Sequence, residues 1–300
     1  MENKELAKKQ CKFAQTFKNW NLTYKLVFIF GLIILLADFI ILIHSFKYHG
    51  IGPLKKIYNR PEFKEAIDKG TIVFNNVVYP NALQAIWSQT MTFTMISNWM
   101  LAITMVVLPF KKDNQKTQAW FMATVVYISI TFLIYWTLIF FVSLKKGIWN
   151  DLKSALPSFI LHAINPLFGI VALILLRKQI SISNKQIWMM SLVISGYFLF
   201  GFITFFIGDQ LVDDKSNAKL YSKYNIVIYT FLNFRHPFFY KGGNVAIVVI
   251  LDLLALSVGI LIAPTIGFIW KYSLKIKNPE IKQNINQKLS EAVSQTIYEN

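Results

Sequence analysis

Few side chains that exchange protons lie inside the long apolar stretches of this 300-residue chain, and they limit the chemistry available there. The ionisable ones deep in these stretches are Asp38, His162 and Asp252, and Thr94 lies among hydroxyl and amide groups. Threonine becomes a nucleophile when a base takes its hydroxyl proton, and imidazole exchanges protons near neutral pH. Thr94 is therefore a candidate nucleophile, and His162 is a candidate group for exchanging protons. His162 with the two aspartates would instead make a proton or cation site.

Helical spacing places an amide beside each of the two proposed catalytic residues. Thr94 and Asn98 lie four residues apart, and His162 and Asn165 lie three apart, so each pair shares one helix face. We therefore expect Asn98 and Asn165 to shape the same site. The structural alternative is that the threonine hydroxyl bonds a carbonyl of the preceding turn and that the histidine only links two helices.

Both aspartates are expected to face the interior of the bundle. Asp38 lies seven residues after Gly31. Asp252 lies three residues before a stripe of small residues on its helix, made of Ala255, Gly259, Ala263 and Gly267. Either carboxyl would orient the imidazole of His162 or shape the pocket, unless it is simply paired or neutral. At about 1.5 Å of rise per residue, Asp38, Thr94, His162 and Asp252 are expected about 8 to 14 Å from the outer surface.

Composition requires that these residues be carried by membrane helices. The chain is 55% hydrophobic and 15% charged, with a mean hydropathy of +0.45, which is too apolar for a soluble protein. We predict an all-α polytopic integral membrane protein with a bundle of six transmembrane helices, each without Lys or Arg. The predicted spans are 26–46, 85–109, 119–143, 157–176, 187–207 and 244–270.

The net charge of +16 would suggest nucleic acid in a soluble protein, but here all 31 basic residues lie in tails and loops. Of these, 17 fall on the side of the two termini and 14 on the other, which favours a cell-membrane protein with both termini cytoplasmic. The expected partners are membrane lipids, with no nucleic acid. Cys11 is the single cysteine, and no metal or cofactor is expected.

The segments outside the spans have predicted structure of their own. Residues 1–25 form a basic amphipathic cytoplasmic segment, 26–270 the six-helix transmembrane domain, and 271–300 a cytoplasmic tail helix. On the outer side, residues 72–80 are typical of a short hairpin around Asn-Asn. Residues 225–234 are an apolar run too short to span, and we expect an interfacial or re-entrant segment that covers the bundle.

Three motifs resemble those of one family. Phe-Thr-Met-Ile-Ser-Asn-Trp-Met-Leu-Ala at 93–102 resembles the Phe-Thr-x-x-Ser-Asn-Leu-Leu-x-Ala run of bacterial six-span proteins related to the androgen-induced membrane-protein family. The run at 161–167 is similar to their His-x-x-x-Pro-Leu motif, and Tyr-Thr-Phe-Leu at 229–232 with 241–246 is similar to the entry to their last helix. Order and spacing agree over about residues 85–265.

The resemblance implies an activity. Animal members of that family hydrolyse fatty-acid esters of hydroxy fatty acids with an intramembrane threonine nucleophile and a histidine base. By resemblance, Thr94 would be the nucleophile, His162 the base, and a hydrophobic ester the substrate. Two alternatives stay open: a component of a proton- or cation-coupled transporter, and a non-catalytic membrane scaffold.

Overall fold

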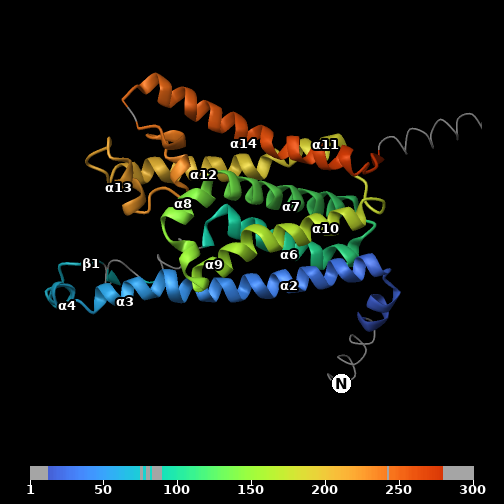
Figure 1. The fold of residues 1–300 in the computed structure, drawn as a ribbon, viewed down its shortest axis with the longest axis horizontal. Coiled ribbons are helices and arrows are strands. Elements are labelled where there is room, and N and C mark those ends of the chain that lie inside the picture. The colour runs from blue at the N-terminus through green and yellow to red at the C-terminus, as the bar shows by residue number, and fades with distance from the viewer. Residues whose placement is uncertain (1–12, 75–76, 79–81, 83–89, 242, 280–300) are drawn as a thin grey trace, which may run out of the picture.

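The computed structural model describes residues 13–74, 77–78, 82, 90–241 and 243–279, and these residues form a helical bundle (Figure 1). Six helical segments in them are long and apolar enough to cross a membrane. The chain is therefore an all-α, multi-pass membrane protein, as the sequence predicts. The six spans are Leu22–Tyr58, Phe93–Lys111, Gln115–Lys145, Leu152–Leu176, Asn184–Asp209 and Val245–Ser273.

Several spans contain a tighter or wider turn between α-helical parts. The elements of the spans are α2 (Leu22–Ser45), η1 (Phe46–Ile51), α3 (Gly52–Tyr58), α6 (Phe93–Val107), η2 (Leu108–Lys111), α7 (Gln115–Ile134), η3 (Tyr135–Ile139), α8 (Phe140–Lys145), α9 (Leu152–Phe159), η5 (Ile160–Ile164), α10 (Asn165–Leu176), α11 (Asn184–Met189), α12 (Ser191–Asp209) and α14 (Val245–Ser273). The connections contain α4 (Pro61–Asp68), β1 (Val73–Phe74), β2 (Val77–Val78), η4 (Ile148–Asn150), α13 (Ala218–Lys223), η6 (Thr230–Leu232) and η7 (Pro237–Phe239).

The main core lies between α2, α6, α7 and α10. Helix α2 packs along α6, α6 along α7, and α10 against both α2 and α7. A Cβ on Gly31 of α2 would lie 2.9 Å from the Cβ of Met105 and 2.9 Å from the backbone nitrogen of Val106, so α2 and α6 approach this closely because Gly31 has no side chain. The face of α2 that the sequence assigns to the interior is thus the buried face, and Asp38 on it is fully buried.

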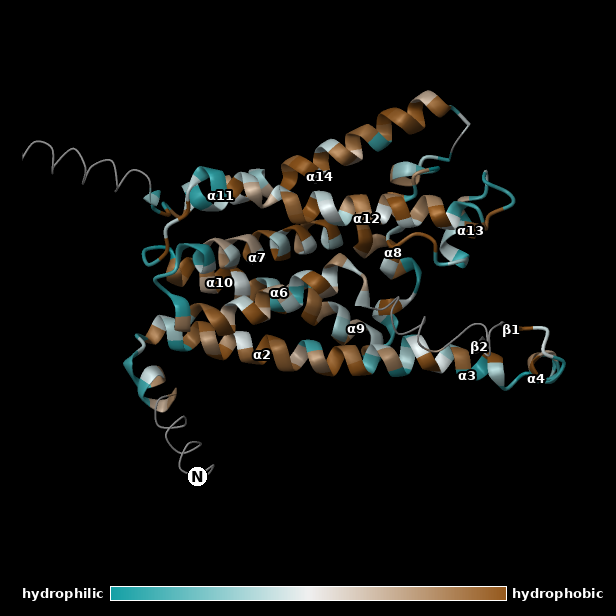
Figure 2. Ribbon diagram, turned by 180° about the vertical axis from the view of Figure 1, so that it is seen from behind, coloured by the Kyte–Doolittle hydropathy of each residue, from teal (hydrophilic) through white to brown (hydrophobic). Residues whose placement is uncertain are grey.

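Helices α12 and α14 form a second pair beside α7. The N-terminal half of α14 leans away from α12 in both ribbon views (Figures 1 and 2). The predicted small-residue stripe of α14 therefore divides. A Cβ on Gly267 would lie 2.8 Å from Ile187, whereas one on Gly259 would lie 3.8 Å from its nearest neighbour, Phe198. Close helix packing uses only the C-terminal part of the stripe.

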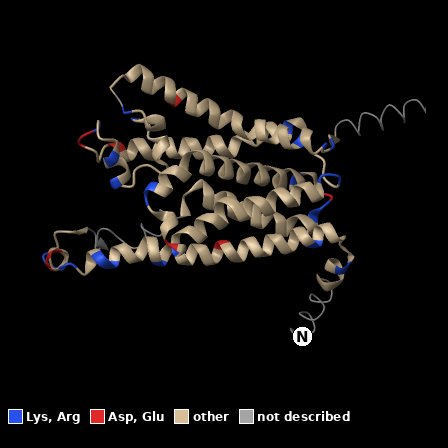
Figure 3. Ribbon diagram, in the orientation of Figure 1, with Lys and Arg blue, Asp and Glu red and all other residues tan. Residues whose placement is uncertain are grey.

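Most charged residues lie at the two ends of the bundle, and mostly hydrophobic residues make up the length between them (Figures 2 and 3). The first and last described residues lie at the same end, as six spans require (Figure 1). In the N-terminal segment, Phe17 and Trp20 pack on Phe28, with ring centroids 6.0 and 5.4 Å away. Residues 1–12 and 280–300, which include most of the predicted tail helix, lie outside the described residues.

In the connection between the first two spans, β1 pairs antiparallel with β2, as the predicted hairpin requires, while its Asn-Asn turn at 75–76 and residues 79–80 lie outside the described residues. The longer connection after α12 is fixed by Asp209 at the end of that helix. Its carboxylate accepts hydrogen bonds from Tyr221 (2.7 Å), Arg235 Nη2 (2.8 Å) and Lys215 Nζ (3.0 Å). The Asp209 carboxylate also raises the pKa of Arg235. This cluster holds residues 210–236 against the end of the bundle.

One predicted boundary is wrong at a place that matters for the site. The sequence predicts one helix from residue 85. Residues 85–89 lie outside the described residues, but the chain is not helical at positions 91 and 92 and α6 begins at Phe93, with Thr92 as its N-cap and the Thr92 hydroxyl accepting from the Met95 amide at 3.3 Å. Hydroxyl side chains favour the cap position over the helix interior because they bond the free amides of the first turn. Thr94 is therefore the second residue of α6 rather than a residue well inside a longer helix.

Replacing Gly31 with alanine tests the close packing of α2 on α6. We expect Gly31→Ala to destabilise the protein by about 1–3 kcal/mol, because the added methyl group overlaps backbone atoms of α6. Gly196→Ala in α12 is the matched control, since a Cβ added there would meet no atom within 4 Å and alanine favours the helix. Thermal unfolding midpoints in detergent micelles would report the difference. An unchanged midpoint for Gly31→Ala would contradict this packing.

Candidate active site

Thr94 stands where a helix starts inside the bundle. It is buried, with 9% of its surface exposed, and the residue after it has its amide capped by Thr92. The first amides of a helix have no partner within the helix, and together they give the helix start a partial positive charge. The Thr94 hydroxyl therefore lies beside first-turn amides whose acceptors come from outside the helical hydrogen-bond pattern.

His162 is carried by the π turn η5, shortly before Pro166. Proline has no N–H, so Pro166 cannot donate to the carbonyls of Leu161 and His162, five and four residues earlier. Side chains bond both carbonyls: Trp136 Nε1 donates to His162 at 2.9 Å, and Asn98 Nδ2 donates to Leu161 at 3.3 Å. π turns of this kind are frequent at functional sites.

The Thr94 hydroxyl and the His162 ring are in contact, with 3.4 Å between Oγ1 and Nε2. The other ring nitrogen, Nδ1, lies 2.7 Å from the carbonyl oxygen of Ser158. A carbonyl oxygen can only accept, so Nδ1 carries the hydrogen and donates it. In the neutral ring Nε2 is then a lone-pair acceptor, and it faces the threonine hydroxyl. This is the arrangement that a general base needs.

The ring of His162 is also held from its face. Tyr135 stacks on it with 3.6 Å between ring centroids and 14° between planes. The Tyr135 hydroxyl lies 2.6 Å from Ser158 Oγ, on the residue whose carbonyl bonds Nδ1. Neither aspartate orients the imidazole, contrary to the sequence-based expectation. A backbone carbonyl takes that place because residue 158 lies one helical turn before residue 162.

Asp38 instead belongs to a polar chain that supports the site from behind. Asn165 Nδ2 donates to Asp38 Oδ1 and to Asn98 Oδ1, both at 2.8 Å. Asn98 Nδ2 in turn donates to the Thr94 carbonyl at 2.8 Å as well as to Leu161. This row of polar side chains joins α2, α10 and α6. It ends on the backbone of the residues that position Thr94 and His162. Asp38 Oδ2 is buried and has no hydrogen-bond partner among the described residues.

Asp252 is not brought to the site. It lies on the part of α14 that leans outward, and within the described residues no hydrogen bond joins it to Asp38, Thr94 or His162. One of its oxygens, Oδ1, is buried without a partner in the described part of the chain. The equal depth of Asp38 and Asp252 along their helices does not bring them together.

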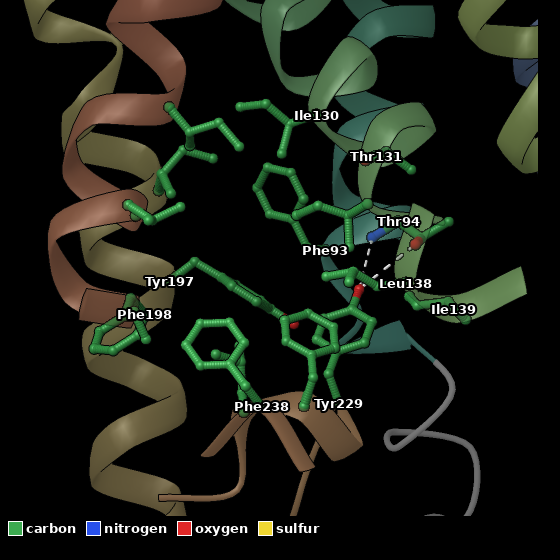
Figure 4. Close-up of a pocket in the computed structure, with 18 residues that line it drawn as sticks. Phe93, Thr94, Ile130, Thr131, Leu138, Ile139, Tyr197, Phe198, Tyr229 and Phe238 are labelled. Atoms are coloured by element: carbon green, nitrogen blue, oxygen red, sulfur yellow. Dashed lines mark hydrogen bonds between the residues drawn. The ribbon is translucent and has the colours of Figure 1, made fainter. Parts of the chain in front are cut away.

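Tyr229 is a site residue that reasoning from residue types missed. Its hydroxyl lies 3.3 Å from the Thr94 amide nitrogen, which donates to it, and 3.5 Å from Thr94 Oγ1 (Figure 4). Burial raises the pKa of Tyr229, so the hydroxyl keeps its proton near neutral pH. The segment at 225–234 thus does cover the bundle, and the only sequence signal for Tyr229 was its place in the third motif.

Thr94 and Tyr229 lie at the wall of an apolar cavity of about 270 Å³ (Figure 4). Its walls come from α7, α12, α14 and the segment around η6, and its polar lining groups are the hydroxyls of Thr94, Thr131, Tyr197 and Tyr229. Ala255 and Gly259 line it where α14 leans away from α12. His162 lies behind Thr94 rather than in the wall. Neither aspartate lines the cavity.

The arrangement is suited to nucleophilic attack by a side-chain hydroxyl on an apolar substrate. It offers a hydroxyl with an adjacent base, neutral donors beside that hydroxyl, and an apolar space in front of it. Metal chemistry has no evident ligand set, since no group of three His, Cys, Asp or Glu side chains in the described part of the chain is placed to hold an ion.

A double-mutant cycle on Asp38 and Asn165 tests the polar chain. We expect Asn165→Leu to destabilise the protein by about 1–3 kcal/mol, because it leaves a buried carboxyl without its donor. Asp38→Leu/Asn165→Leu should be at least about 1 kcal/mol more stable than the sum of the single changes, since both partners are removed together. Denaturation in micelles would measure all four proteins. Additive effects would contradict the hydrogen bond.

Comparison of the chain with family models, with curated proteins and with solved structures found no match. The likeness to the androgen-induced membrane-protein family therefore rests on the three short motifs. Two of these motifs hold Thr94 and His162, and the third holds Tyr229. What the chain does has to be argued from the geometry of these residues.

Proposed function

We propose that this protein is an intramembrane hydrolase of hydrophobic esters, with Thr94 as nucleophile and His162 as general base. One observation carries the proposal: Thr94 Oγ1 lies 3.4 Å from a His162 nitrogen whose lone pair faces it, and the same threonine lines an apolar cavity. The likeness of the three motifs to a family with threonine hydrolases supports it further.

The reaction would proceed in two halves. His162 Nε2 takes the hydroxyl proton while Thr94 Oγ1 bonds the ester carbonyl carbon, and the Ser158 carbonyl stabilises the positive ring through Nδ1. The alcohol then leaves with the proton from Nε2, and the acyl group remains on Thr94. Water, activated by the same base, releases the acid and restores the threonine.

The cavity favours a lipid substrate. Its walls are almost entirely apolar, so an acyl chain would fill it as it fills a bilayer, with its ester group at the hydroxyls. A coupled transporter is less well supported, because none of Asp38, His162 and Asp252 is among the described residues that line this cavity. We further propose that the protein resides in the cell membrane with both termini in the cytoplasm, following the weak excess of basic residues on that side.

Labelling of membranes with a fluorophosphonate probe tests the nucleophile and the base. We expect the wild type to be labelled at Thr94, Thr94→Ala not to be labelled, and His162→Ala to be labelled at least about 100-fold more slowly. Thr131→Ala is the matched control, because Thr131 is another hydroxyl of the same cavity and should not affect labelling. Peptide mass spectrometry would locate the adduct. Labelling that survives Thr94→Ala, or an unlabelled wild type, would overturn the proposal.

Filling the cavity tests where the acyl chain lies. We expect Gly259→Leu to lower the activity on long-chain p-nitrophenyl esters by at least about tenfold relative to the butyrate ester, because the new side chain occupies the apolar space. Gly196→Leu adds the same side chain to α12 at a position with open space and should leave the ratio unchanged. An equal loss on short and long esters in Gly259→Leu would place the chain elsewhere.

A further inference from the structure

We propose that the Tyr229 hydroxyl and the Thr94 backbone amide together bind the ester carbonyl oxygen and the negative charge that develops on it. This inference rests on the proposed function, and it assigns the electrophilic half of the site, which the pairing of Thr94 with His162 leaves open. Hydrolysis through a tetrahedral intermediate needs such donors, and they often supply the largest single contribution to the rate.

The two donors lie next to each other and beside the nucleophile. The Thr94 amide nitrogen lies 3.3 Å from the Tyr229 oxygen, and that oxygen lies 3.5 Å from Thr94 Oγ1. A carbonyl carbon attacked by Oγ1 carries its oxygen to a position within reach of both donors. The amide of a nucleophile is a common member of such a site in acyl-transfer enzymes. Thr94 can supply it because the second residue of a helix has no acceptor four residues before it.

The fold holds the Tyr229 hydroxyl in this place. Tyr229 lies at the start of η6, stacks on Phe231 with 5.4 Å between ring centroids, and accepts at its carbonyl from the Leu232 amide at 2.9 Å. On the cavity side its neighbour is Tyr197, whose own hydroxyl is occupied by the Met91 carbonyl at 2.7 Å. The Asp209 cluster fixes the rest of the connection to the end of α12. Because its oxygen is held in place, Tyr229 has only to rotate its hydroxyl hydrogen during the reaction, so little reorganisation is needed.

The surroundings make neutral donors effective. The cavity wall has no Lys or Arg among the described residues, so no cation competes for the oxyanion. In an apolar site a neutral hydrogen bond to an ionised oxygen is considerably stronger than in water. The start of α6 adds the partial positive charge of a helix N-terminus.

The step balances in atoms and charge. The hydroxyl proton of Thr94 passes to His162 Nε2, Oγ1 forms the new bond to the carbonyl carbon, and the carbonyl π pair moves onto the oxygen. The Tyr229 hydroxyl hydrogen rotates from Thr94 Oγ1 to that oxygen, and the Thr94 N–H, which is fixed by the helix, is shared between the tyrosine oxygen and the same atom. When the intermediate collapses, the pair reforms the carbonyl and the alkoxide leaves with the proton from His162. Tyr229 keeps its own proton throughout.

Tyr229→Phe tests the assignment, since it removes the hydroxyl and keeps the ring. We expect kcat for a p-nitrophenyl ester to fall about 100- to 1,000-fold with KM changed less than about threefold. Affinity for a matching trifluoromethyl ketone, which forms a tetrahedral adduct on Thr94, should fall by a similar factor. Tyr127→Phe is the control, because this buried hydroxyl bonds the Met190 carbonyl away from the cavity, and it should change neither value.

The outcomes separate the inference from the proposed function. A wild type that neither turns over the ester nor binds the ketone overturns both. An active wild type with an equally active Tyr229→Phe overturns the oxyanion assignment alone. If Tyr229→Phe does not fold, 3-fluorotyrosine at position 229 retains ring and hydroxyl while making the hydroxyl a stronger donor. Affinity for the ketone should then rise more than affinity for a non-reactive ester analogue, and unchanged ketone affinity would overturn the assignment.

Discussion

The missing amide hydrogen of Pro166 is the constraint around which the site is arranged. Inside a bilayer a backbone carbonyl finds no water, so a carbonyl that loses its helical donor must receive another from a neighbouring helix. Asn98 and Trp136 supply these donors to Leu161 and His162. The result is that the turn carrying His162 is bonded to α6 through Asn98 and to the end of the third span through Trp136. A helix without the proline could satisfy these carbonyls internally, and the bonds to the neighbouring helices would not be required.

The same requirement operates at the start of α6. A helix that begins inside the bundle exposes amides that need acceptors, and Thr92 and Tyr229 provide them. Thr94 is thereby placed where helix geometry leaves its amide available and its side chain at the cavity wall. One interruption, at Pro166, positions the proposed base, and the other, at the start of α6, positions the proposed nucleophile. Both lie where a continuous helix would have offered neither.

Sequence patterns predict the bundle and part of the site. The six apolar stretches, the buried face of α2 that carries Asp38, and the hairpin near residue 75 follow from hydropathy, periodicity and turn residues. Helical spacing also selects Asn98 and Asn165, which the structure joins to Asp38. Their roles, and those of Thr94 and His162, stay predictions.

The remaining features depend on geometry that a sequence does not display. The acceptor for Nδ1 is a backbone carbonyl, which every residue has, so nothing in the sequence marks Ser158 as its source. Tyr229 reaches Thr94 across 135 residues of chain, through a connection whose course is set by the Asp209 cluster. Asp252 fails to reach the site because α14 leans outward at its N-terminal half, where Gly259 has no close neighbour. Two residues at the same depth along different helices can still lie far apart across the bundle.

Because charged groups lie away from the cavity, the proposed reaction should favour release of its ionised product. The carboxyl of Asp38 meets Asn165, away from the cavity wall, Asp252 does not line the cavity, and most other charged groups lie at the ends of the bundle (Figure 3). A neutral ester is only weakly hydrated, so it can enter such an apolar space at little cost in free energy. The acid it yields, once ionised, finds no Lys or Arg in the described cavity wall, and a buried carboxylate without a partner is costly. The ionised product is therefore more stable with its head group at a hydrated end of the bundle, where basic residues lie. The apolar walls that admit the substrate thus also favour release of the acid.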